Sequence, residues 1–224
     1  MSAPKPPHRT ICSTDKDPVW HAQLAILAAL ILQLTLPDIF IPGPRILLPC
    51  LEGLLMLSLF FTTKKHVFTN TPLRKMNAVV LIILMGIANV YALQQLAHAL
   101  LKGGSIQNGH GLIIAAMNIF LTNIIVFGLL YWEFDAGGPG KRTIDNVRNR
   151  DFSFPQMQNP EVAPIGWLPS FIDYLYVSLT NATAFSPTDT MPLTRIAKIL
   201  MSIQSLTSLT AVALVVSRAV NILQ

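Results

Sequence analysis

The sequence predicts an all-α integral membrane protein with about five transmembrane helices and one re-entrant pore helix and loop before the last helix. Hydrophobic residues make up 52% of the 224 residues and charged residues only 12%, whereas a soluble domain carries roughly 25% charged residues. Several apolar runs approach or reach the length that crosses a ~30 Å hydrocarbon core. A shorter helical run, then a polar turn with two prolines, then another long apolar run predict the re-entrant element.

The N-terminal part begins with a polar tail at residues 1–18, which contains several prolines. Residues 21–36 form the first predicted spanning helix. We expect this helix to remain as an anchor, because acidic residues precede it and no small-residue cleavage site follows it. Residues 46–61 form the second helix, which is about 24 Å long at 1.5 Å per residue and has Glu52 near its centre. An ionisable residue at that depth marks a functional site, or it bridges helices as a protonated or hydrogen-bonded acid.

Two longer apolar runs follow. Residues 76–101 form the third predicted crossing, in which Gln94 and His98 share a face at i, i+4 spacing. Such a pair either binds a ligand or a proton, or, more commonly, hydrogen-bonds between helices. Residues 111–132 form the fourth crossing, and three polar side chains in it are expected to face other helices: Asn118, Thr122 and Asn123. Residues 136–166 contain glycine and proline breaks without periodicity, so no regular element is predicted there.

The C-terminal part carries the re-entrant prediction. Residues 171–183 form a helix about 20 Å long, which is too short to cross the hydrocarbon core. The polar turn SPTDTMP follows, and residues 193–223 then form one long apolar helix. Irregular backbone at membrane depth is tolerated only where protein or water covers it. The alternative is an interfacial helix, a surface loop and an ordinary spanning helix.

The stretch YVSLTNATAFSPTDTMPLT resembles, without gaps, the pore-helix, filter and outer-mouth segment of potassium channels. The chain is therefore similar to the tetrameric pore-loop cation channel superfamily over roughly its last quarter, although residues 184–188 replace that family's T-V-G-Y-G signature. The resemblance implies a homotetramer that conducts monovalent or small cations. The chain is also similar to bacterial membrane proteins of unassigned function in which stretches like YWEFDAGGP and NATAFSPTDTMPLTR recur.

The loop chemistry differs from that of a potassium filter. Such a filter needs glycines for its stack of backbone carbonyls, and Pro187 further restricts the backbone and removes a donor. We expect a hydrated cation to pass with little preference for potassium. Phe185 is either a hydrophobic gate or packs behind the loop. The residues expected to form the conduction path are Thr183, Ala184, Phe185, Ser186, Pro187, Thr188 and Asp189.

The last helix carries Ser202, Ser205 and Ser208 at a spacing of three. Small hydroxyl residues at this spacing either let helices approach closely or line an aqueous path. The expected organisation is therefore a tail at 1–18, three N-terminal crossings within 19–110, and a pore-like module at 111–224. No cofactor-binding or metal-binding motif and no catalytic signature is recognised, so we expect neither an enzyme nor a bound cofactor.

Five crossings place thirteen basic residues on one side and three on the other, Arg45, Lys102 and Arg218. The crowded side holds Lys5, Arg9, Lys16, Lys64, Lys65, Arg74, Lys75, Lys141, Arg142, Arg148, Arg150, Arg195 and Lys198. The positive-inside rule makes that side cytoplasmic, whereas potassium channels admit their pore loop from outside. We prefer the charge count, which predicts a multi-pass protein of the cell membrane whose pore loop enters from the cytoplasm. The net charge of +5 then indicates contact with anionic membrane lipid rather than nucleic acid.

Two other functions remain open at this point. A non-conducting membrane scaffold with a pore-like fold would show no ion flux. A small-solute transporter would use Glu52 and His98 as coupling groups, but transporters commonly show internal repeats, and none is recognised in this sequence.

Overall fold

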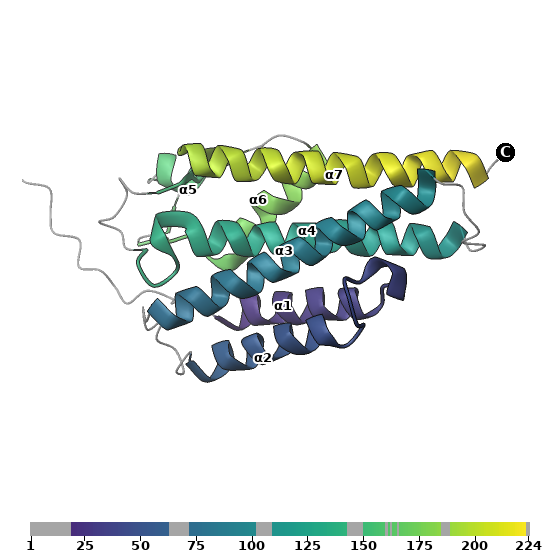
Figure 1. Cartoon of the computed structure of the whole chain (residues 1–224). Helices are drawn as coiled ribbons and strands as arrows, with labels where there is room; N and C mark the ends of the chain where they lie inside the picture. Colours follow the sequence, from purple (N-terminus) through teal and green to yellow (C-terminus); the bar gives the residue numbers. More distant parts are fainter. Residues whose placement is uncertain are drawn as a thin grey trace, which may run out of the picture.

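The protein is an antiparallel helical bundle (Figure 1). The computed structural model describes residues 19–62, 72–101, 109–142, 150–159, 161, 163–164, 166–184 and 189–222. The elements in chain order are α1 (Val19–Leu34), the 3-10 turn η1 (Asp38–Phe40), α2 (Leu47–Thr62), α3 (Pro72–Leu101), α4 (Gly109–Phe134), the 3-10 turn η2 (Asp135–Gly137), β1 (Phe152–Ser153), α5 (Pro155–Gln158), α6 (Phe171–Ala184), β2 (Met191–Pro192) and α7 (Arg195–Ile222).

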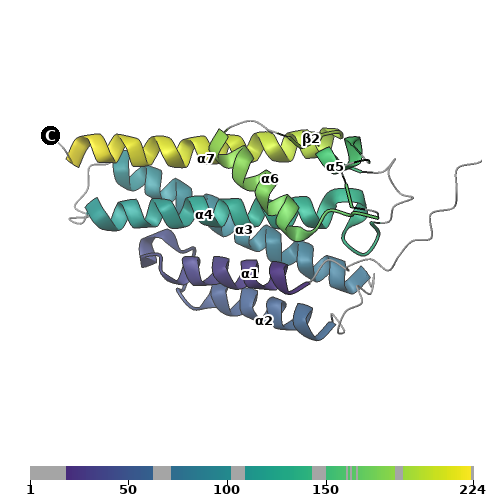
Figure 2. The ribbon, with the colours of Figure 1, turned by 180° about the vertical axis from the view of Figure 1, so that it is seen from behind.

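The helices stack in three tiers. In Figure 1, α1 and α2 lie below α3 and α4, while α7 lies along the opposite side of α4. Figure 2 shows α6 crossing α4 obliquely towards α7. One apolar core joins these tiers, because it contains Ile26 of α1, Met85 of α3, Leu129 of α4, Val177 of α6 and Met201 of α7.

Three helices of the described chain are long and apolar enough to span a membrane: α3, α4 and α7. The expected all-α fold class is confirmed, and the three apolar helices suggest a membrane-embedded protein. The helices α1 and α2 have 16 residues each and so measure about 24 Å, somewhat less than the hydrocarbon thickness. Whether these two helices complete a five-span topology stays a prediction.

Helix α4 lies at the centre of the molecule. Two-thirds of its spanning window (67%) is buried, compared with 22% for that of α7. At Gly128, an added Cβ would lie 3.2 Å from the Cα of Leu175 in α6. The missing side chain therefore lets the backbones of α4 and α6 come into close contact.

The two ends of the bundle differ in charge. The start of α1, the end of α2, the start of α3, the end of α4 and the start of α7 share one end (Figure 1). We name it the charged end after its described basic residues Arg74, Lys75, Lys141, Arg142, Arg150, Arg195 and Lys198. The α1–α2 connection lies at the opposite end, which we name the far end, and its basic residue Arg45 pairs with Asp38 at 2.8 Å.

The segment between α4 and α6 is more ordered than its sequence indicates. No regular element was expected over residues 136–166, yet β1 pairs antiparallel with β2, and the short helix α5 follows β1. The chain reverses after α4 through three successive residues with positive φ, Ala136 (54°), Gly137 (83°) and Gly138 (109°). Glycine adopts this backbone region without steric cost, which explains the GG pair.

Candidate functional site

Helix α6 occupies only the half of the bundle nearest the charged end. Its first residue, Phe171, packs edge-on against Trp132 at the end of α4, with ring centroids 5.8 Å apart. Its third turn reaches Asn181, which contacts Gln204 of α7. Because Gln204 is nine residues into α7, this contact lies about 14 Å along that helix. Helix α6 therefore ends beside the middle of the bundle.

The chain then returns to the end from which it came. Residues 185–188 lie outside the described residues, and Asp189 leads directly into β2. In β2, Met191 pairs with Ser153 of β1, and β1 precedes α6 in the chain. The entry into α6 and the entry into α7 are thus joined at the charged end, with α6 extending from there towards mid-depth (Figure 2).

A buried hydrogen-bond network holds α6 between α4 and α7. The amide oxygen of Gln204 accepts from the hydroxyl of Tyr131 (2.5 Å) and from the amide nitrogen of Asn181 (2.8 Å). The amide nitrogen of Gln204 donates to the carbonyl oxygen (2.9 Å) and the hydroxyl (2.6 Å) of Ser178. The Ser178 hydroxyl donates to the carbonyl of Ile124 at 2.6 Å. We name Tyr131, Ser178, Asn181 and Gln204 the three-helix network.

A second polar contact lies deeper along α4 and α7. The amide nitrogen of Asn123 donates to the Ser208 hydroxyl at 2.9 Å, and the Thr207 hydroxyl donates to the amide oxygen of Asn123 at 3.3 Å. Asn118 similarly donates to the Thr35 hydroxyl beyond the end of α1 at 2.7 Å. Of the three polar residues expected to face other helices, Asn123 contacts α7, Asn118 contacts the residue that follows α1, and Thr122 is buried. Asn118 and Asn123 make these contacts by neutral hydrogen bonds.

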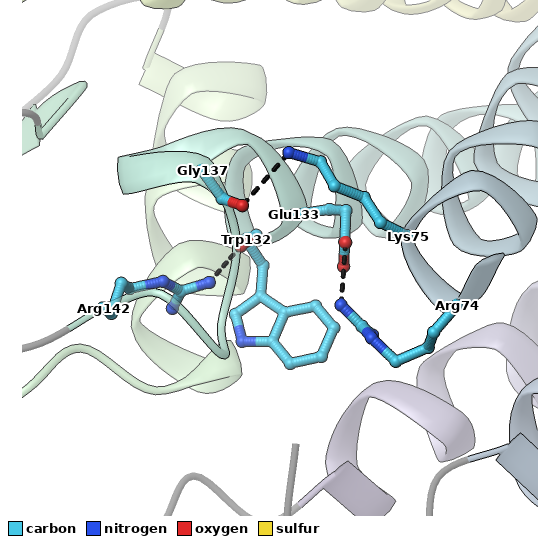
Figure 3. A network of polar contacts seen from close by, with 6 residues as sticks. All are labelled: Arg74, Lys75, Trp132, Glu133, Gly137 and Arg142. Atoms are coloured by element: carbon cyan, nitrogen blue, oxygen red, sulfur yellow. Dashed lines mark hydrogen bonds and ion pairs between the residues drawn. The ribbon is translucent and has the colours of Figure 1, made fainter. Parts of the chain in front are cut away.

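The turn after α4 connects the N-terminal helices with this region (Figure 3). Glu133, which is fully buried, pairs with Arg74 of α3 at 2.9 Å. Lys75 donates to the carbonyl of Gly137 at 3.1 Å. On the other side, Arg142 donates to the carbonyl oxygen of Trp132. Basic side chains from α3 and from the following loop therefore bind the Glu133 carboxylate and two backbone carbonyls at the end of α4.

Asp135 continues this connection towards α6 and α7. Its carboxylate accepts from the backbone N–H groups of Asp151 (2.6 Å) and Phe152 (3.2 Å). It also accepts from the hydroxyl of Tyr174 in the first turn of α6. Asp151 in turn accepts from the Thr194 hydroxyl at 2.5 Å, just before α7. One buried carboxylate thus fixes the starts of β1 and α6 and, through Asp151, the start of α7.

The structure describes three of the seven residues expected on the conduction path. Thr183 and Ala184 form the exposed last turn of α6, and the Thr183 hydroxyl donates to its own helix at Leu179. Asp189 is exposed at the charged end. The remaining four, Phe185, Ser186, Pro187 and Thr188, lie outside the described residues.

The three serines of α7 have three different environments. Ser202 is exposed and donates to the carbonyl of Lys198 in its own helix at 2.9 Å. Ser205 is half-buried and donates to Asn181 at 3.2 Å. Ser208 is fully buried against Asn123. Within one chain, Ser205 and Ser208 serve helix packing, and Ser202 has the side chain that remains accessible for lining a path.

The two other polar candidates lie apart from α6. Glu52 is fully buried in α2. His98 and Gln94 lie together on an exposed face of α3. The structure does not join Glu52 and His98 in one site. Glu52 is enclosed within α2 and its carboxylate oxygens have no hydrogen-bond partner among the described residues, whereas His98 is exposed near the end of α3.

Tyr131 and Gln204 are central to the three-helix network, yet neither was singled out from the sequence for this role. A glutamine within an apolar run is a usable signal, because an amide in hydrocarbon needs partners. Tyr131 lies beside Trp132 near the end of α4, a position that is also typical of an aromatic anchor at a membrane interface, so its residue type alone does not indicate the network.

The described residues contain no group of three or more His, Cys, Asp and Glu side chains arranged to hold a metal ion. Comparison of the chain with protein-family models, with curated proteins and with solved structures finds no match.

Proposed function

We propose that the protein is a tetrameric cation channel in which α4, α6 and α7 are the outer, pore and inner helices. The observation that supports this most is the half-depth helix α6, which enters from the charged end and is followed by a return to the same end. A helix and loop of this kind bring irregular backbone to mid-depth, where it needs cover from protein or water. In the proposed assembly, four copies surround a water-filled axis and supply that cover.

The orientation of α6, with its C-terminus at mid-depth, favours the passage of cations over anions. Its C-terminus points to mid-depth, and a helix C-terminus carries the negative end of the helix dipole, equivalent to roughly half an elementary charge. No basic residue lies in the last turn of α6 to neutralise that end. Asp189 adds an exposed carboxylate at the mouth. Both features attract a positive ion and repel an anion.

The exposed faces of α6 and α7 supply the surface that tetramer formation needs. On α6 the exposed stripe consists of Ile172, Tyr176, Leu179 and Thr183. On α7 the exposed apolar side chains include Ile196, Ile199, Ile203 and Leu206. In the proposed tetramer, neighbouring copies cover part of these faces and membrane lipid covers the rest. A cyclic arrangement repeats each path-lining side chain as a ring of four.

The loop sequence argues for weak selectivity. Residues 184–188 contain no glycine and contain Pro187, so a stack of backbone carbonyls like that of a potassium filter is disfavoured. Hydroxyl side chains and the ring of Asp189 would contact a cation that keeps part of its water shell. Sodium and potassium are therefore expected to pass at comparable rates.

Cation flux into liposomes tests this proposal, with Asp189→Asn as the diagnostic variant. Asp189→Asn should lower sodium and potassium flux severalfold at low salt and less at high salt, because an exposed charged ring acts through a screened field. Glu161→Gln is the matched control, since Glu161 is also exposed in the segment before α6. The control should leave flux unchanged.

Strong selectivity for potassium would contradict the account of the loop. A complete lack of sodium and potassium flux under all voltages and pH values would favour the second candidate, a non-conducting scaffold. That candidate draws its support from the fully paired network around Gln204, which fixes α6 whether or not ions pass.

A further inference from the structure

Glu52 and Gln33 form an isolated polar pair inside the N-terminal helices. Glu52 of α2 is fully buried, Gln33 of α1 is 6% exposed, and the two side chains lie close enough to interact. Among the described residues, neither carboxylate oxygen of Glu52 and neither amide atom of Gln33 has a partner within normal hydrogen-bond geometry. Four polar atoms in one place are thus left without a well-formed bond.

An ionised Glu52 does not suit this environment. A buried carboxylate without a cationic partner costs several kcal/mol or more. The ionised carboxylate has only acceptor oxygens, so it could accept a hydrogen bond from the amide nitrogen of Gln33. The amide oxygen of Gln33 would then have no donor and would be repelled by the negative carboxylate. Such a charge is expected to be neutralised by a bound proton or cation.

We propose that Glu52 and Gln33 form a proton-binding site in which the protonated acid and the amide pair through two complementary hydrogen bonds. The acid O–H donates to the amide oxygen of Gln33, and the amide N–H donates to the acid carbonyl oxygen. One proton thereby satisfies all four atoms, after a small rotation of the two side chains. The O–H bond forms with a proton taken from water, and deprotonation returns it to water.

The surroundings offer no competing charge. On α1 the titratable residue is His21, twelve residues from Gln33 and so about 18 Å along the helix. On α3, Asn89 marks the level of the site, because it lines the same cavity as Gln33. Arg74 and Lys75 are 15 and 14 residues before Asn89 and so more than about 20 Å away along α3. His98 is nine residues after Asn89, about 14 Å in the other direction. Tyr91 is two residues beyond Asn89, about 200° around the helix. In the α1–α2 connection, Asp38 and Arg45 are exposed and pair with each other.

The proposed route of the proton to water passes a small cavity beside Gln33. This cavity is lined by Gln33, Asn89, Phe40, Ile41, Leu48 and Pro49, among others, and has a volume of about 10 Å³, close to the space that one water molecule needs. It lies between Gln33 and the α1–α2 connection at the far end. The proton would therefore exchange with the far end, away from the proposed pore loop entrance, and the inference does not depend on ion conduction.

Infrared spectroscopy of the purified full-length protein tests the inference. A protonated carboxylic acid has a carbonyl-stretching band separate from the bands of carboxylates. The wild type should show this band at neutral pH, and Glu52→Gln should lose it. Glu161→Gln, which removes an exposed glutamate, should retain it. Gln33→Leu should keep the band but move it to higher frequency, because the acid carbonyl loses its amide donor.

Three results would overturn the inference. The first is a wild-type spectrum without the band at neutral pH, and the second is a band that survives unchanged in Glu52→Gln. The third is a band that disappears when sodium chloride replaces choline chloride, which would identify a sodium site instead. If Glu52→Gln fails to fold, the frequency shift in Gln33→Leu still decides, since an acid band that does not respond to loss of the amide would exclude the pair.

Discussion

At the scale of single residues, Gln204 has the largest share of the polar contacts that hold α6. It is fully buried, and its amide group bonds to Tyr131, Asn181 and Ser178. Its amide oxygen bonds to Tyr131 of α4 and Asn181 of α6, and its amide nitrogen bonds to Ser178 of α6, so no isosteric apolar residue can replace it. The network is neutral, which suits a region without bulk water.

Gln204→Leu should destabilise the protein by roughly 2–5 kcal/mol, because a buried group left without a partner costs about 1–3 kcal/mol and several groups are affected. Thermal unfolding in detergent, followed by circular dichroism, measures this as a lower melting temperature. Gln94→Leu is the matched control on an exposed face of α3 and should change the melting temperature little. Equal effects of the two substitutions would refute the role assigned to the network.

The sequence predicted the environments of only some of the polar residues. Asn118 and Asn123 were expected to face other helices; Asn123 bonds to α7, and Asn118 bonds to Thr35 just after α1, because an amide inside an apolar run has few alternatives. The different environments of Ser202, Ser205 and Ser208 could not be foreseen. A spacing of three turns successive residues by about 60° around the helix, and only the positions of α4 and α6 determine which serine becomes buried.

At the scale of elements, Gly128 sets the distance between α4 and α6. An added Cβ would lie 3.2 Å from both the Cα and a side-chain methyl of Leu175. Since the Cα belongs to the backbone of α6, a Cβ at position 128 requires that backbone to shift by a few tenths of an ångström. Gly86 on α3 differs, because the nearest atom to its added Cβ is a Val126 methyl at 3.5 Å, an ordinary contact.

Gly128→Ala and Gly86→Ala should therefore act in opposite directions. Alanine improves the helix propensity of both positions by up to about 1 kcal/mol, which should raise the melting temperature of Gly86→Ala. In Gly128→Ala the contact with Leu175 should outweigh this gain and lower the melting temperature. If the protein conducts ions, Gly128→Ala should also change the flux, because α6 carries the loop. An increase in stability in both variants would contradict the close contact.

The elements themselves were largely predictable, because long apolar runs bounded by polar or proline-containing segments indicate helices directly. The expected helix at residues 171–183, for example, corresponds to α6 at Phe171–Ala184. The pairing of β1 with β2 was not predictable. It depends on the carboxylates of Asp135 and Asp151, which bond to backbone and side chains up to 43 positions away in the chain.

At the scale of the whole molecule, the distribution of basic residues is the main indication of orientation. Most of the described basic residues gather at the charged end, and the structure also brings the entry into α6 to that end. The positive-inside rule predicts that the charged end faces the cytoplasm. The proposed pore loop then enters from the cytoplasm, opposite to potassium channels, as the charge count of the sequence already indicated.

Labelling of engineered cysteines in intact cells tests this orientation. In a background without Cys12 and Cys50, Lys141→Cys at the charged end should resist a membrane-impermeant thiol reagent, whereas Asp38→Cys at the far end should react. Both native side chains are exposed, so access within the protein is matched. Lysis of the cells should make Lys141→Cys reactive. The reverse pattern in intact cells would invert the orientation.

The central claim is that α6 and its loop surround the axis of a tetramer. A cryo-electron microscopy map of the full-length protein in lipid nanodiscs tests this claim most directly, because copy number and the position of α6 are both visible. The account predicts four copies related by a central axis, with the C-termini of α6 and the following loops directed at that axis and α7 beside it. A monomer, or an assembly in which α6 faces lipid on the outside, would contradict the account.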